Sequence, residues 1–144
     1  MESSINSILV KLAIATRIAN ENAMSAIGIH SGQAQVLSLL SENDGQSQAQ
    51  LLRSLGVSAP TVNKIVGKLS ENGFVKTRKC PEDNRLMRVH LTAKGARVQP
   101  RIDEQQKRLE DMILMDFSET EKVLIKMLLE RLYMNLLKNM EPNT

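Results

Sequence analysis

Two short helical patterns separated by the tight turn Gly56-Val57-Ser58 constrain the fold more than any other feature of this 144-residue chain. The first pattern begins at Ser47-Gln48-Ala49-Gln50, a capping box in which the Ser and Gln side chains can satisfy two backbone amides. Gly56 can end this helix in the left-handed conformation. Ser58 can cap the second helix, and Asn72-Gly73 can end it. Two short helices joined by a tight glycine-containing turn form a helix-turn-helix.

Directly after this helix pair, the apolar periodicity changes from 3.6 residues to 2. Residues 74–79 and 87–91 are short alternating runs, and the polar stretch 80–84 between them is typical of a turn. We therefore expect a β-hairpin, or wing, attached behind the second helix.

Helical spacing of apolar residues predicts the remaining elements. The first two dozen residues read as an amphipathic helix, and Ser31 can cap a shorter helix that stops at 41–45. A long helix opens at Thr92, and a second capping box at 118–121 starts the last helix. The expected fold class is mainly α with a small β-hairpin wing (α+β), as one domain over 1–144: a winged-helix core at about 31–99 flanked by helices at about 1–30 and 100–144.

The apolar faces of these flanking helices exceed what one small domain can cover. Exposed apolar patches above a few hundred Å² are rare on monomers. We therefore expect the first and last helices to be dimerisation helices of a homodimer.

The formal net charge of +3 is distributed unevenly along the chain. Residues 51–101 carry eleven bases and three acids, whereas the remainder carries eight bases and thirteen acids. Residues 51–101, about one third of the chain, therefore create a positive electrostatic field that attracts polyanions. When the second helix of such a pair enters the major groove of DNA, residues near its start reach base edges. Here the candidates are Ser58, Ala59, Pro60, Thr61, Asn63, Lys64 and Lys68.

The predicted wing is the most cationic short segment. Asp83 lies two residues before Arg85, close enough to hold the guanidinium through a charge-assisted pair. A rigid arginine at a ribbon tip suits a narrow minor groove, where negative potential is concentrated. The wing residues expected to take part in DNA binding are Arg78, Lys79, Asp83, Asn84, Arg85 and Arg88.

Three segments follow the start of the second predicted helix in order: Gly73-Phe74-Val75-Lys76-Thr77-Arg78, then Asp83-Asn84-Arg85, then Leu91-Thr92-Ala93-Lys94-Gly95. They resemble the pattern G-[FL]-V-x-R, D-x-R and L-T-x-x-G that follows the recognition helix in winged-helix regulators of the MarR type, with the first arginine one place later here. Phe117-Ser118-Glu119-Thr120-Glu121 is similar to the family's L-S-x-x-E. The likeness spans nearly the whole chain, in the same helix order.

This resemblance implies a homodimeric transcription regulator, commonly a repressor, that binds a palindromic operator in double-stranded DNA. It also implies relief of repression by a small-molecule effector, for example a phenolic compound. On this chain, the resemblance implies that Arg85 is the wing-tip residue that enters the minor groove and that Asp83 holds its side chain in position. The recognition-helix positions are Ala59, Pro60, Thr61 and Lys64.

The sequence offers no cofactor, metal or catalytic site. Its two histidines are sixty residues apart, outside any Cys/His cluster or nucleophilic constellation, and it lacks a Gly-rich phosphate loop. We therefore expect neither an enzyme nor a metalloprotein. Family members that sense peroxide carry their reactive cysteine near the N-terminus, so we interpret Cys80 as an incidental wing thiol.

Two features predict the cytoplasm as the location. One cysteine cannot form an internal disulfide, which suits a reducing compartment. Lys11 and Arg17 interrupt the first apolar run, so it is neither a signal peptide nor a membrane span.

Two alternative binding functions remain open. Three scattered aromatic residues argue against an RNA or single-strand binder, because such modules stack bases on aromatic platforms. A winged-helix protein-interaction module without specific DNA binding is the other alternative, against which the wing cations argue.

Overall fold

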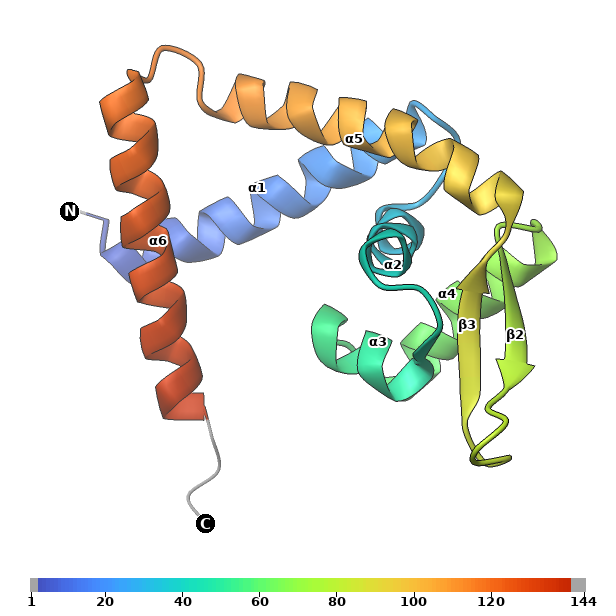
Figure 1. Cartoon of the computed structure of the whole chain (residues 1–144). Helices are drawn as coiled ribbons and strands as arrows, with labels where there is room; N and C mark the ends of the chain where they lie inside the picture. The colour runs from blue at the N-terminus through green and yellow to red at the C-terminus, as the bar shows by residue number, and fades with distance from the viewer. Residues whose placement is uncertain (1–2, 141–144) are drawn as a thin grey trace. The chain divides into compact units, whose positions relative to one another are not determined.

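The computed structural model describes residues 3–140, and the chain divides into two compact units, Met1–Leu109 and Glu110–Thr144. The first unit contains α1 (Ile5–Ser25), α2 (Ser31–Glu42), β1 (Gln46–Ser47), α3 (Gln48–Leu55), α4 (Ala59–Glu71), β2 (Val75–Lys79), β3 (Met87–Leu91) and most of α5 (Ala93–Ile113) (Figure 1). The second contains the end of α5 and α6 (Glu119–Met140). The predicted mainly-α fold with a small antiparallel sheet is confirmed.

Local capping sets the helix starts that the sequence predicted most directly. At α3, the Gln50 amide donates to the Ser47 hydroxyl at 3.2 Å, and the Ser47 amide donates to the Gln50 side chain at 2.8 Å. The same reciprocal pair joins Ser118 and Glu121 before α6. Gly56 ends α3 with φ of 66°, in the left-handed region. Both capping boxes are therefore confirmed.

The sheet has three strands rather than the two of the predicted hairpin. Its order is β1-β3-β2, all antiparallel, with Gln46 opposite Val89 and Ser47 opposite Arg88. Two residues are too few to show a period of 2, which is why the sequence did not reveal β1. Because Ser47 ends β1 and also caps α3, the start of α3 is fixed to the wing.

The core of the first unit lies where α2 and α3 pack against α4. On α4 the buried side chains are Val62, Val66 and Leu69, which share one helix face at spacings of four and three. They join apolar residues of α2, the sheet and α5, namely Val36, Leu37, Leu40, Val75, Val89, Val98 and Ile102. The opposite face of α4 is therefore left to solvent.

The junction between α1 and α2 differs from expectation. Ser31 is not the cap of α2: it is the first helical residue, and His30 occupies the N-cap position. The Ser31 hydroxyl and amide both donate to the Glu21 carboxylate, at 2.6 and 3.2 Å, and His30 Nδ1 lies 3.0 Å from it. The Ser31 hydroxyl, followed by His30, lowers the pKa of Glu21. The Glu21 carboxylate of α1 therefore accepts hydrogen bonds from the first residue of α2.

A cluster of contacts joins the end of α4, the wing and the start of α5. The Thr92 hydroxyl donates to the Gly73 carbonyl at 2.6 Å and accepts from the Gly95 amide at 3.1 Å. Lys94 Nζ donates to the Asn72 carbonyl at 2.6 Å. A Cβ at Gly95 would collide with the carbonyl oxygen of Phe74. This segment can therefore pack only around a glycine.

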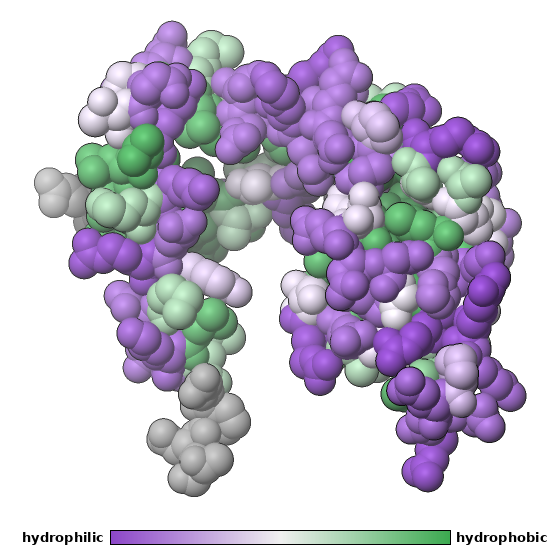
Figure 2. Space-filling view, viewed as in Figure 1, coloured by the Kyte–Doolittle hydropathy of each residue, from purple (hydrophilic) through white to green (hydrophobic). Residues whose placement is uncertain are grey.

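In the second unit, α6 has no buried residue along its described length, Glu119–Met140. Figure 2 shows apolar side chains open to solvent on this helix. In the first unit, the N-terminal part of α1 also exposes Ile5, Ile8, Val10, Leu12, Ile14 and Ile18. The predicted apolar faces are thus uncovered in the single chain. Among the described residues, none of the helices has the length and apolar character needed to cross a membrane.

Candidate nucleic-acid interface

The candidate residues of the recognition helix lie along the exposed side of α4, except Ser58, which is the N-cap just before it. Thr61, Lys64 and Lys68 are separated by three and four residues, so they lie on one face. Lys68 Nζ also pairs with Glu71 Oε2 at 3.4 Å. The whole candidate set is exposed: Ser58, Ala59, Pro60, Thr61, Asn63, Lys64 and Lys68.

Ser58 occupies the N-cap position of α4, as predicted, but its side chain does not cap the helix. Its Oγ lies 2.9 Å from Thr61 Oγ1, in a hydroxyl–hydroxyl hydrogen bond that either group can donate. The expectation of a capping hydrogen bond at Ser58 was therefore wrong. Thr61 is the third residue of the helix, and its hydroxyl competes with its backbone amide as a hydrogen-bond partner for the Ser58 hydroxyl.

The wing loop is held by short hydrogen bonds at its base and tip. The Cys80 amide donates to the Leu86 carbonyl at 2.8 Å, and the Leu86 amide donates to the Asp83 carbonyl at 3.0 Å. At the tip, the Arg85 backbone amide donates to Asp83 Oδ1 at 3.0 Å. Arg85 Nε is 3.9 Å from the same oxygen, and the Arg85 side chain is 95% exposed. The Asp83 carboxylate is therefore hydrogen-bonded to the backbone of Arg85 and lies farther from the Arg85 guanidinium.

Arg88 differs from the other wing cations because it is half-buried. Its Nη1 donates to the Gly45 carbonyl at 3.0 Å. A hydrogen bond from Arg88, with further bonds from the Glu82 and Asp83 backbone, lowers the pKa of the Cys80 thiol, which is itself buried. Arg88 therefore ties β3 to the segment before β1 and to the loop base. Arg78, Lys79, Asp83, Asn84 and Arg85 are exposed.

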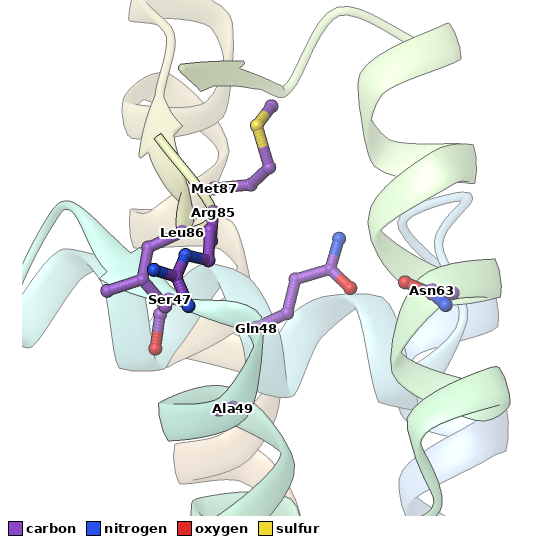
Figure 3. A pocket seen from close by; sticks show the side chains of 7 residues that line it. All are labelled: Ser47, Gln48, Ala49, Asn63, Arg85, Leu86 and Met87. Atoms are coloured by element: carbon purple, nitrogen blue, oxygen red, sulfur yellow. The ribbon is translucent and has the colours of Figure 1, made fainter. Parts of the chain in front are cut away.

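A hollow of about 380 Å³ lies between the wing and the helix pair. Arg85 lines it from the wing tip, Asn63 from α4 and Gln48 from the start of α3 (Figure 3). The remaining lining residues are Ser47, Ala49, Leu86 and Met87. The N-terminus of α3 carries a partial positive charge, so together with Arg85 it makes the hollow suited to an anion. Sequence reasoning missed Gln48 and Ala49, although the capping box already marked a helix N-terminus there.

The two histidines have structural partners. His30 contacts Glu21, and His90 Nδ1 lies 3.6 Å from Asp44 Oδ2. Asp44 Oδ1 also accepts from the Leu91 amide at 2.9 Å, which anchors the end of β3. Within residues 3–140, the His, Cys, Asp and Glu side chains form no group of three or more that could hold a metal ion.

Comparison with known proteins places this geometry in a family. The MarR family model matches residues 27–86. An uncharacterised HTH-type transcriptional regulator of Bacillus subtilis, YwoH, is 33% identical over 104 residues, which are 72% of this chain and 74% of that protein. The crystal structure of a MarR transcriptional regulator from Methanosarcina mazei is 27% identical with a TM-score of 0.85, covering 94% of this chain and 98% of that one.

A more distant structure is that of a MarR family protein from Mycobacterium tuberculosis in complex with salicylic acid. It is 23% identical, with a TM-score of 0.73, and the match covers 91% of this chain and 97% of that one. The family model covers the helix-turn-helix and the first strand and turn of the wing, and the B. subtilis regulator is 33% identical over 72% of this chain. The relationship therefore extends beyond the shared fold. This chain belongs to the MarR family of winged helix-turn-helix transcriptional regulators.

Proposed function

We propose that this protein is a cytoplasmic, sequence-specific repressor that binds double-stranded DNA as a homodimer. The observation that carries the proposal is the shared hollow, which makes the exposed face of α4 and the wing tip neighbours on one surface, through Asn63 and Arg85. A helix for the major groove and a cation for the flanking minor groove are thereby available to one duplex. The activity is binding, without a chemical step.

The two parts of this surface have different roles in the proposal. Thr61 and Lys64, near the start of α4, reach base edges in the major groove, where each base pair has its own donor and acceptor pattern. Lys68, Arg78 and Lys79 contact phosphates, which position the protein without reading sequence. Arg85 enters the minor groove, whose width depends on sequence.

Dimerisation through α1, α5 and α6 is supported by their exposed apolar side chains. Two copies related by a two-fold axis require a near-palindrome with half-sites roughly 10 bp apart. The salicylic acid bound by the M. tuberculosis protein supports a small aromatic acid of the phenolic class as the effector that relieves repression here.

Sedimentation should give a species of twice the 16.1 kDa chain mass at micromolar concentration. Leu128→Asp should shift the protein to monomer, because it places a charge in the exposed apolar face of α6. Lys126→Asp is the matched control on the same helix and should leave the dimer intact, since Lys126 is an exposed polar position. A wild-type monomer at that concentration would contradict dimerisation.

Arg85→Ala should weaken binding to a matched operator by about 1–3 kcal/mol, because it removes the minor-groove cation. The measurement is fluorescence anisotropy at one salt concentration, with matched and single-mismatch duplexes. Thr61→Ala and Lys64→Ala should instead change which bases are preferred. If Arg85→Ala bound as tightly as wild type, the minor-groove role of Arg85 would be contradicted.

Substitution of Asp83 tests whether this residue orders the wing tip or only repels DNA. The two roles predict opposite changes in DNA affinity. Asp83→Ala should weaken binding, because the hydrogen bond that orders the wing tip is lost. Asp83→Asn keeps an oxygen that can accept from the Arg85 amide, so it should bind at least as well as wild type. Repulsion alone predicts that both variants bind more tightly. Tighter binding by Asp83→Ala would therefore show that the acid only repels DNA.

A further inference from the structure

The hydroxyl–hydroxyl bond at the start of α4 gives Ser58 a role of its own. We infer that Ser58 is a positioning residue that fixes the side-chain rotamer of Thr61 and thereby sets the base preference of the recognition helix. This inference rests on the proposed function, because it assigns how one residue of the DNA-reading face is held. Ser58 itself need not touch a base for the effect.

Ser58 does not accept the backbone hydrogen bond that an N-cap serine usually accepts. At the starts of α1, α3 and α6, the serine hydroxyl accepts from the backbone amide three residues later, at 3.1, 3.2 and 3.1 Å. At α4 the Ser58 hydroxyl makes no such capping bond and lies instead within hydrogen-bond distance of the Thr61 hydroxyl. The Ser58 hydroxyl is therefore directed at a side chain of the exposed face.

A threonine in a helix needs a hydrogen-bond partner of this kind to be held in one rotamer. Threonine in a helix populates two χ1 rotamers, because its hydroxyl can also bond a carbonyl of the preceding turn. The 2.9 Å bond to Ser58 favours the rotamer that turns Oγ1 toward the N-cap. The position of the methyl group is then fixed as well, since both groups are carried on the same Cβ.

The rotamer of Thr61 determines which of its groups faces a given base. In the major groove, a threonine methyl can pack against the methyl of thymine, and its hydroxyl can bond a polar base edge. Exchanging the two rotamers moves one group to where the other was. If Thr61 were divided between the two rotamers, the protein would bind two different base pairs about equally well. Loss of the Ser58 hydroxyl should therefore relax discrimination between base pairs rather than abolish binding.

Ser58→Ala should lower discrimination by about fivefold at the base pair where Thr61→Val changes the preference, the magnitude expected of one hydrogen bond. The readout is the ratio of dissociation constants for matched and single-mismatch duplexes. Ser58→Thr keeps a hydroxyl and should restore the ratio. In a Thr61→Val background, Ser58→Ala should have no further effect. Ser118→Ala removes a true cap, so it should lower the melting temperature more than Ser58→Ala does while leaving the ratio unchanged.

Three-bond couplings from the Thr61 methyl carbon to the backbone nitrogen and carbonyl carbon test the same inference on the free protein. They should report one rotamer in wild type and Ser58→Thr, and averaged values in Ser58→Ala. Unchanged couplings in Ser58→Ala would overturn the inference, as would an equal loss of affinity for every duplex. If wild type bound no duplex, the proposed function would fail, and the couplings alone would decide whether Ser58 positions Thr61.

Discussion

Binding to duplex DNA should weaken by about 10⁴-fold between roughly 50 and roughly 200 mM salt. Five exposed cations of each protomer are directed to DNA in the proposal, and one of them, Lys68, is already paired with Glu71. The four that remain are Lys64, Arg78, Lys79 and Arg85. If a dimer neutralises about 8 phosphates in this way, log K against log[salt] has a slope near −7. Arg88 does not enter this count, because its guanidinium is held by the Gly45 carbonyl.

Anisotropy titrations across the salt range measure this slope. Lys79→Ala removes one phosphate contact per protomer, so it should reduce the magnitude of the dimer's slope by about 2. Lys126→Ala, on α6, is the matched loss of one cation outside the interface and should leave the slope unchanged. A flat salt dependence for wild type would favour a protein-interaction role for the winged helix.

Gly95→Ala should destabilise the fold by at least about 3 kcal/mol, at the upper end of the usual cost of overpacking. The added Cβ would meet the Phe74 backbone carbonyl, and it would also lie 3.1 Å from Leu91 Cδ2. Relief requires the backbone of α5 to move away from the wing, which would strain the bonds of Thr92 to Gly73 and Gly95. The expected fall in melting temperature is on the order of 10 °C.

Gly67→Ala is the matched control, because nothing lies within 4 Å of a Cβ at this helical position. It should stabilise the protein by up to about 1 kcal/mol, the difference in helix propensity between alanine and glycine. Urea unfolding of both variants measures the change. A Gly95→Ala variant as stable as wild type would mean that the start of α5 can shift without cost.

Sequence reasoning succeeded where structure depends on neighbours within one turn. The Ser47–Gln50 and Ser118–Glu121 caps are bonds between residues three apart, so the sequence alone contains both partners. Alternation likewise identified β2 and β3, whose pairing buries Val75 and Val89. The order of helices and the exposed face of α4 followed from the same short-range patterns.

The residues that sequence reasoning misjudged have partners elsewhere in the chain. Ser31 is held by Glu21 of the preceding helix, and Arg88 by Gly45, which is 43 residues away. Periodicity describes which face a side chain occupies, but not which distant carbonyl or carboxylate lies opposite it. The pairing of β1 with β3, which brings Gly45 near Arg88, was invisible for this reason.

The separation of the two faces of α4 has a consequence for how such regulators diverge. Val62, Val66 and Leu69 hold the helix in the core, whereas Thr61, Lys64 and Lys68 make no contribution to that packing. Substitutions on the outer face are therefore nearly neutral for folding. A duplicated copy of the gene can change its target sites without first acquiring compensating stability, and an engineer can vary the same positions to obtain regulators that do not cross-react.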